Sequence, residues 1–204
     1  IMGIGLEAYT KEPKIIDGEL DWHSGASSSL NSKIISTTLD PFQETGGLAD
    51  LNGNLGSAVM KVSAVEISRR KITAPVRVFN DQESVLKAFR DGEFINDVII
   101  AVRYQGPRAN GMPELHNLTP CMSVLQTRGL NVALITDGRM SGASGKVPAA
   151  IHMSPEALDD GPIAYLQDGD MVTVNALNGT IDVDNNKIFD RKVNHPDLMN
   201  NSFG

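Results

Sequence analysis

The sequence is poor in cysteine, since Cys121 is the only one among its 204 residues. A single thiol excludes an intrachain disulfide, and it excludes a zinc site or an iron–sulfur cluster built from this chain's cysteines alone. The sequence also has no apolar run that approaches 18 residues, so we expect no transmembrane helix and no membrane partner. A reducing, cytoplasmic setting fits the cysteine content.

Positive charge is in deficit as well, because 18 Lys and Arg stand against 25 Asp and Glu, a net charge of −7. This balance argues against sequence-independent nucleic-acid binding, which needs a basic surface. It leaves room for a small anionic substrate, because one site can be locally positive. The first residues lack the basic and long apolar segments of a signal peptide. The first residue is not Met, so we expect a fragment or a processed chain.

Apolar patterns and turn signals predict an α/β fold in a single domain over residues 1–204. We expect an extended or hairpin-like segment over 1–30, mainly loops over 31–56, and a flexible tail over 186–204. Strands are predicted at 58–67, 74–79, 97–104 and 132–136, and helices at 81–90 and 120–128. Asn80 with Glu83 has the spacing of a capping box for the first helix, and Thr119 with Pro120 is expected to start the second.

The order of strand, loop, helix and strand between residues 97 and 136 indicates a βαβ unit with parallel strands. Its two loops would then lie at the carboxyl ends of neighbouring strands, where open α/β sheets bind ligands. Near the end of the chain, two alternating runs joined at Asn178-Gly179 predict a hairpin. Together these pieces predict a mixed β-sheet or barrel with flanking helices.

The stretch from Asn131 to Ala157 organises the rest of the chain. A strand runs into a loop rich in glycine and serine, followed by an apolar segment that we interpret as a candidate helix. Such a loop can present backbone N–H groups to a polar ligand. It is not a phosphate-binding P-loop, because Met140 stands where the first glycine should be and Val147 follows Lys146. Ser141 also does not fit the Gly-x-Ser-x-Gly motif of a hydrolase nucleophile, because position 139 is arginine.

Ser141 is nevertheless a candidate general base. A serine hydroxyl is weak at neutral pH unless its alkoxide is stabilised, and loop N–H groups, Lys146, Arg139 or a divalent metal could do so. Glu114 on the partner loop is a natural ligand for Mg²⁺, which prefers carboxylate oxygen. The alternative interpretation is that the Ser141 and Ser144 hydroxyls only bond to backbone groups of the turn. Glu114 would then be a charge at a helix start, and the Arg139 and Lys146 side chains would be solvated.

The remaining cysteine and histidines have plainer interpretations. We interpret Cys121, in a predicted helix, as a small core residue. A packed structural role is predicted for His152, and contact with substrate or a partner domain for His116. His23 and His195 lie in polar tracts and are predicted to be solvated.

Residues 136–152, TDGRMSGASGKVPAAIH, resemble the C-terminal signature of the dihydroxy-acid dehydratase/6-phosphogluconate dehydratase family. The continuation ASGKVPAA is similar to the 6-phosphogluconate branch. The same branch is indicated by 104–116 (YQGPRANGMPELH), by Gly46-Gly47-Leu48 with 53–56 (GNLG), and by 9–13 (YTKEP). The resemblance covers about residues 5 to 185.

This resemblance implies the swivelling β/β/α domain of aconitase-like dehydratases. It implies dehydration of 6-phospho-D-gluconate to 2-keto-3-deoxy-6-phosphogluconate, as in the Entner–Doudoroff pathway, with an iron–sulfur cluster and Mg²⁺ as cofactors. Ser141 maps to the proposed base for the C2 proton, and Glu114 to a metal ligand. We expect these residues to contact the substrate: Arg139, Gly142, Ser144, Lys146 and His116.

The family's cluster cysteines lie in a larger N-terminal domain that this sequence does not contain. We therefore expect the chain to act with its own N-terminal domain, as a homodimer in the full-length form, and to be inactive alone. The alternative hypothesis is a non-catalytic domain whose glycine loop binds an anion or serves assembly.

Overall fold

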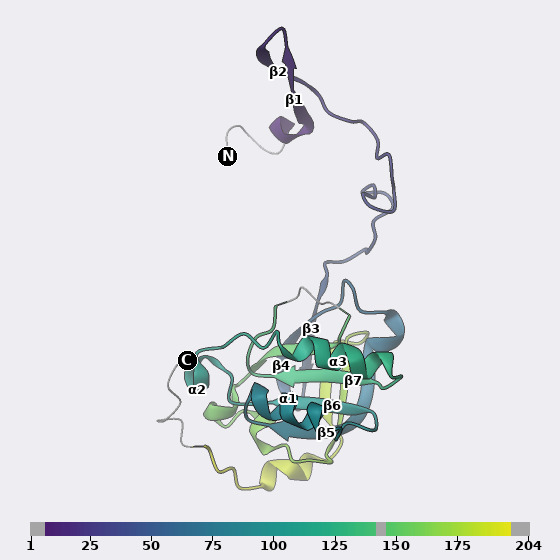
Figure 1. The fold of residues 1–204 in the computed structure, drawn as a ribbon. Helices are drawn as coiled ribbons and strands as arrows, with labels where there is room; N and C mark the ends of the chain where they lie inside the picture. The colour runs from purple at the N-terminus through teal and green to yellow at the C-terminus, as the bar shows by residue number, and fades with distance from the viewer. Residues whose placement is uncertain (1–6, 142–145, 197–204) are drawn as a thin grey trace. The chain divides into compact units, whose positions relative to one another are not determined.

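The structure, a computed structural model, describes residues 7–141 and 146–196. The chain divides into two compact units, residues 1–44 and 45–204, where we predicted a single domain. Figure 1 shows the ribbon with labels on helices and strands of both units. No helix within the described residues is long and apolar enough to cross a membrane.

The first unit is organised around one β-hairpin. The 3-10 helix η1 (Glu7–Thr10) leads into β1 (Lys11–Ile16), which pairs antiparallel with β2 (Glu19–Ser24). Asp17 and Gly18 join the strands with positive φ angles of 51° and 85°, as a type I′ turn requires. The hairpin interpretation of the N-terminal segment is thus confirmed. Residues 25–47, all described, contain no helix or strand.

The second unit is a mixed sheet of eight strands in the order β10-β9-β5-β6-β7-β8-β4-β3. Its strands are β3 (Leu48–Gly53), β4 (Gly56–Lys61), β5 (Lys71–Phe79), β6 (Val98–Val102), β7 (Val132–Thr136), β8 (Ala149–Ser154), β9 (Met171–Asn175) and β10 (Thr180–Val183). Strands β5 to β8 are parallel to one another, and the outer pairs are antiparallel. The predicted βαβ unit and the hairpin β9–β10 are both confirmed.

The two edges of this sheet approach each other. The Asn52 N–H donates to the Gly179 carbonyl at 2.9 Å, and the Leu55 N–H donates to the Ile181 carbonyl at 3.4 Å. These bonds join β3 and its turn to β10 and the turn before it, so the sheet is nearly closed into a barrel. The predicted mixed sheet or barrel is therefore confirmed, with little edge left unpaired.

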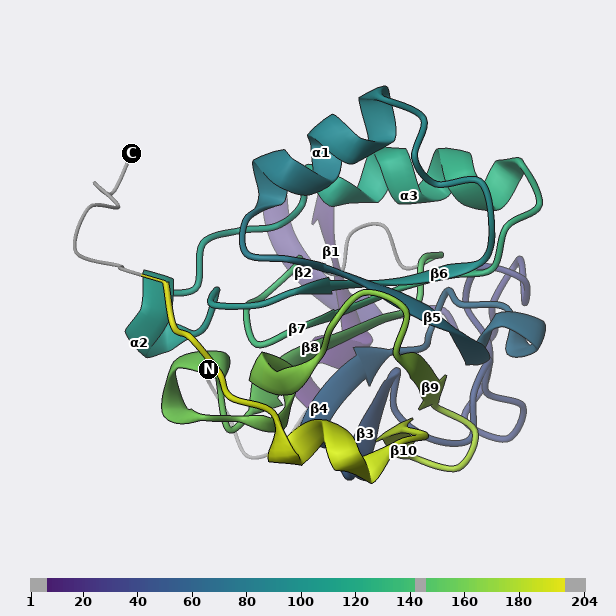
Figure 2. The same ribbon diagram turned by 90° about the horizontal axis from the view of Figure 1, so that it is seen from below.

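Helices α1 (Gln82–Arg90) and α3 (Leu118–Thr127) cover one side of the parallel strands. The short helix α2 (Pro107–Asn110) contacts the 3-10 helix η4 (Ala157–Asp159) instead. The other 3-10 helices are η2 (Ile67–Arg69), η5 (Pro162–Tyr165) and η6 (Asn186–Asp190). Figure 2 shows α1 and α3 side by side over β5, β6 and β7.

Strand β6 explains why the core has two parts. All five of its residues are apolar and buried. Ile100 and its alternate neighbours pack with α1 and α3, whereas Ile99 and Ala101 pack inside the barrel. Because side chains alternate across a strand, a strand buried on both faces must be apolar throughout, as the sequence indicated.

The helix starts differ by one or two residues from the prediction. Asp81, not Asn80, caps α1, and its Oδ1 accepts from the Ser84 N–H at 2.7 Å. Asn80 instead accepts from Arg103 at 2.8 Å. Helix α3 begins at Leu118 after Asn117, so Thr119 and Pro120 lie within its first turn.

One predicted segment was wrong, and two were correct only in part. The candidate helix after the serine loop is strand β8, which pairs with β7 and β4. Residues 31–47 are loop as predicted, but residues 48–53 of the same region form β3. The predicted tail begins with η6, where Ile188 is fully buried and Arg191 pairs with both oxygens of Asp170, and its residues 197–204 lie outside the described residues. In β8, β3 and η6, long-range pairing or burial provides the stability that the local sequence does not indicate.

Candidate active site

Two loops meet where the parallel strands β6 and β7 end. The first follows β6 and reaches Glu114, and the second follows β7 and reaches Ser141. A parallel bridge joins Glu114 to Arg139, and the Leu115 N–H donates to the Arg139 carbonyl at 3.2 Å. The sequence placed both loops at the same edge of the sheet, and these contacts confirm that they touch.

Ser141 lies against two side chains of the first loop. Its backbone N–H donates to Oε1 of Glu114 at 2.6 Å, and its hydroxyl lies 3.4 Å from Nδ1 of His116. Arg139 donates from Nε to the Met112 carbonyl at 2.7 Å, and its guanidinium is 3.4 Å from the Glu114 carboxylate. We call Ser141, Glu114, His116 and Arg139 the serine cluster. It combines a hydroxyl, a carboxylate, an imidazole and a guanidinium at an exposed surface.

A buried carboxylate holds the two loops in place. Asp137, directly after β7, is 1% exposed. It accepts from the N–H groups of Tyr104 at 3.1 Å, Gln105 at 2.9 Å and Ala157 at 2.9 Å. Burial raises the pKa of Asp137, while these three bonds oppose the rise. Asp137 thus joins the segments after β6, β7 and β8.

Glu156 performs a similar task beside it. Its carboxylate is buried and accepts from the N–H groups of Arg108 at 2.9 Å and Ala109 at 3.1 Å, in the first turn of α2. Gly106 precedes that turn, and any Cβ there would overlap the Glu156 side chain. A glycine is therefore required for the close approach of the two segments.

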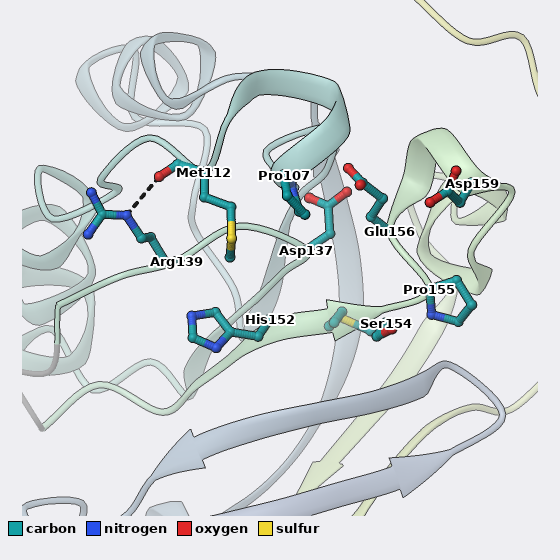
Figure 3. Close-up of a pocket in the computed structure, with 10 residues that line it drawn as sticks. Pro107, Met112, Asp137, Arg139, His152, Ser154, Pro155, Glu156 and Asp159 are labelled. Atoms are coloured by element: carbon teal, nitrogen blue, oxygen red, sulfur yellow. Dashed lines mark hydrogen bonds between the residues drawn. The ribbon is translucent and has the colours of Figure 1, made fainter.

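A cavity of about 630 Å³ lies next to the serine cluster. Figure 3 shows Asp137, Glu156 and His152 around it, together with Met112 and Arg139. Arg139 belongs to both the cavity wall and the serine cluster, so the two adjoin. The volume is in the range of small-molecule sites.

Backbone strain concentrates around this cavity. Met112 and His152, which line the cavity, have positive φ angles of 55° and 56°. Tyr104, whose N–H donates to Asp137 in the cavity wall, has a φ angle of 61°. Such conformations are unfavourable for residues with a side chain and persist where the surroundings enforce them, often at functional sites. His152 is exposed at the cavity, so the packed structural role predicted for it was wrong.

The structure places the predicted substrate residues in different locations. Arg139 and His116 are in the serine cluster. Lys146 is exposed and lines a separate cavity with Gln126 of α3, whose Nε2 donates to the Lys146 carbonyl at 3.4 Å. Gly142 and Ser144 lie outside the described residues.

Two residues that position this site were not identified from the sequence. The turn pair Asp137-Gly138 marked the end of a strand, but nothing indicated the three N–H groups that the carboxylate accepts. Glu156 showed no signal at all, because its partners lie 47 and 48 residues away in the chain.

His195 and Cys121 have local roles away from the serine cluster. His195, expected to be solvated, lies 2.9 Å from Asp160 and packs edge-on against Tyr104. Cys121 is buried and its thiol donates to the Leu118 carbonyl at 2.9 Å. Burial raises the pKa of Cys121, which agrees with the interpretation as a core residue.

The described residues fit Mg²⁺ as a cofactor but not an iron–sulfur cluster. Within the described residues no three His, Cys, Asp or Glu side chains gather into a metal site. Glu114 can still serve as a single carboxylate ligand for Mg²⁺, an ion that commonly takes its other ligands from substrate and water. An iron–sulfur cluster needs several thiolates, and the buried Cys121 cannot provide them.

A model of the family described as dihydroxy-acid/6-phosphogluconate dehydratase C-terminal matches residues 33–201. A phosphogluconate dehydratase of Pseudomonas aeruginosa is 56% identical over 183 residues, which cover 90% of this chain and 30% of that protein. One from Escherichia coli K12 is 48% identical over 206 residues, covering 100% of this chain and 34% of that protein. The chain thus spans about a third of the length of these curated relatives.

Proposed function

Because the chain belongs to the dihydroxy-acid/6-phosphogluconate dehydratase family, as its C-terminal domain, we propose that it forms one side of the active site of a hydro-lyase. The reaction removes water from 6-phospho-D-gluconate and yields 2-keto-3-deoxy-6-phosphogluconate, as in the Entner–Doudoroff pathway. The observation that carries the proposal is the contact of Ser141 with Glu114 and His116.

Ser141 is the base that takes the C2 proton of the substrate. Its hydroxyl is a weak base unless a neighbour accepts the hydroxyl proton, and we assign that role to Nδ1 of His116, which lies 3.4 Å from the hydroxyl. As the C2 proton moves to Ser141, the hydroxyl proton moves to His116, and the C3 hydroxyl departs. The proton and the hydroxide together make one water, and the enol becomes the 2-keto acid.

Glu114 would hold Mg²⁺ at this site, and the ion would supply positive charge for the substrate carboxylate. Arg139 orients Glu114 through its guanidinium and also lines the adjoining cavity. That cavity receives the rest of the sugar acid, beside the exposed His152. Gly142, Ser144 and Lys146 also belong to the proposed substrate-binding set.

The complete enzyme needs more than this chain. The iron–sulfur cluster of the proposed enzyme takes its ligands from an N-terminal domain of a longer polypeptide, because this chain has one buried cysteine. A homodimer of that polypeptide and a cytoplasmic location complete the proposal.

The experiment is Ser141→Ala in a full-length polypeptide that carries this sequence as its C-terminal part. Turnover of 6-phosphogluconate should fall by about 10²- to 10⁴-fold, the range for loss of a general base, while iron content and thermal unfolding stay unchanged. Ser68→Ala, at an exposed serine of η2, is the matched control. Undiminished turnover in Ser141→Ala would reject the assignment and favour a non-catalytic anion-binding or assembly role.

The metal proposal is tested separately by Glu114→Gln, which removes the charge and keeps the shape. A higher Mg²⁺ concentration should be needed for half-maximal activity. An unchanged Mg²⁺ dependence would rule out Glu114 as a ligand.

A further inference from the structure

The β1–β2 hairpin has one apolar face that the other described residues of its own unit, 7–44, leave exposed. Residues that pair directly across antiparallel strands lie on the same side. Pro13 pairs with Trp22, and Ile15 pairs with Leu20, so these four form one continuous face. We call Pro13, Ile15, Leu20 and Trp22 the hairpin face.

The opposite side of the hairpin is mainly polar. Glu12 pairs with His23 and Lys14 with Asp21 across the strands. An ion pair joins Lys14 to Glu12, and Nε2 of His23 lies 3.3 Å from the Asp21 carboxylate. Of the large apolar residues, only Ile16 lies on that side. The hairpin is therefore amphipathic, as a strand pair packed on one face would be.

The hairpin face is strongly exposed. Ile15 is 77% exposed, Leu20 63% and Trp22 55%. A two-stranded hairpin is at best marginally stable in water without packing on one face. The following segment has the same character, because these large apolar residues in it are all exposed: Leu30, Ile34, Ile35, Leu39 and Phe42.

We propose that the hairpin face is a docking surface for the region that precedes this chain in the longer polypeptide. The chain spans about a third of its curated relatives, so two thirds of their length lies elsewhere. The C-terminal family model begins only at residue 33, whereas the alignment with the Escherichia coli relative includes the whole chain. The hairpin thus lies outside the C-terminal domain's own pattern and is shared with the longer relatives.

Trp22 anchors the contact. A tryptophan that gains a pocket contributes more to an interface than its area alone indicates, and Ile15 and Leu20 extend the apolar surface beside it. The polar side stays in water. The inference rests on the proposal that the chain works within a longer polypeptide, and not on the assignment of Ser141 or Glu114.

The test is site-specific crosslinking in the full-length polypeptide. The photoreactive residue p-benzoylphenylalanine replaces Leu20 on the hairpin face or, as the matched control, Asp21 on the polar side. Mass spectrometry should find crosslinks from position 20 to residues that precede this chain, with these crosslinks lost at position 21. In a mixture of light and heavy protein, the products should be light–light or heavy–heavy only.

Mixed light–heavy products would show that a second copy covers the hairpin face, and crosslinks confined to residues 45–204 would show that the chain covers it itself. Either result, or no crosslink from position 20, overturns the proposal. Hydrogen exchange of the unmodified protein is a second measurement: amides of 11–24 should exchange more slowly in the full-length polypeptide than in this chain, and equal rates contradict docking. Turnover in the same preparation reports separately on the proposed function.

Discussion

At the scale of single residues, His116 distinguishes the serine cluster from an ordinary serine turn. Its Nδ1 faces the Ser141 hydroxyl, and the backbone N–H of Ser141 donates to Glu114. Replacing His116 with Asn removes the group that accepts the proton. Turnover of the full-length enzyme should fall by about 10²-fold, with a smaller change in KM.

A second variant separates this role from mere packing. His116→Gln keeps a polar side chain that cannot take up a proton, so its turnover should fall as far as that of His116→Asn, while thermal unfolding stays unchanged. Wild-type turnover in either variant would contradict the role, and Ser68→Ala again serves as the control.

Asp137 makes folding stability depend on pH. Burial raises the pKa of Asp137 above its ordinary value of 3.8, so the folded protein binds this proton more tightly than the unfolded chain. The free energy of unfolding should therefore fall as pH rises from the ordinary value through the raised one.

Asp137→Asn should remove that pH-dependent component. It should also lower stability by about 1–3 kcal/mol, because an amide NH₂ would face a backbone N–H donor. Urea unfolding at several pH values measures both effects, with the exposed Asp50→Asn as the control. An unchanged pH slope in Asp137→Asn would show that this carboxyl is not its source.

The buried thiol of Cys121 should be slow to react. The thiolate is the reactive form, and burial both raises the pKa of Cys121 and excludes reagent. Iodoacetamide should alkylate the folded chain much more slowly than the chain in urea, as followed by mass spectrometry. Equal rates in the two conditions would mean that Cys121 is accessible.

At the scale of elements, one ion pair fixes the end of the described chain. The two terminal guanidinium nitrogens of Arg191, just after η6, donate to the carboxylate of Asp170, just before β9, at 2.5 and 2.9 Å. The Arg191 hydrogen bonds lower the pKa of Asp170. This contribution is present above the ordinary pKa of the carboxyl and is lost as pH falls through the lowered one.

Asp170→Asn should therefore destabilise the protein by about 1–3 kcal/mol at neutral pH, the range for hydrogen bonds to charged groups. The difference from the wild type should shrink in acid. Thermal unfolding at neutral and acid pH measures it, with Asp184→Asn on the same hairpin as the control. A difference that is constant over this pH range would mean that charge is not the cause.

Local sequence patterns predicted the elements whose own residues determine them. β6 has five apolar residues in succession, β7 has four before Thr136, and the hairpins have Asp-Gly and Asn-Gly turns, so each of these elements is defined within a short window. Strands β3 and β8 escaped prediction for the opposite reason. Gly46-Gly47 and Asn52-Gly53 indicate loops, and Ala149-Ala150 favours a helix, but both segments are strands because β4 lies between them and pairs with each.

At the scale of the whole molecule, the sequence predicted that two loops meet at the candidate site, but it did not predict the residues that hold them in place. Parallel strands place their carboxyl ends at the same edge of a sheet, so the loops that carry Glu114 and Ser141 were expected to adjoin. Asp137 and Glu156 act through backbone N–H groups of distant segments, and backbone groups carry no sequence signal. Lys146, close to Ser141 in sequence, lines another cavity instead.

The last prediction concerns the chain as it stands. We expect it to fold, because residues 45–204 enclose their own core, and to show no measurable dehydration of 6-phosphogluconate. The serine cluster provides one carboxylate and the chain one buried thiol, too few ligands for the proposed metal and iron–sulfur centres together. Purified chain should contain no stoichiometric iron, whereas the full-length polypeptide should show an iron–sulfur absorbance and turnover. Circular dichroism and cooperative unfolding of the chain are measured in parallel, so that inactivity can be assigned to missing ligands and not to misfolding. Turnover by the chain alone would contradict the division of the active site between two domains.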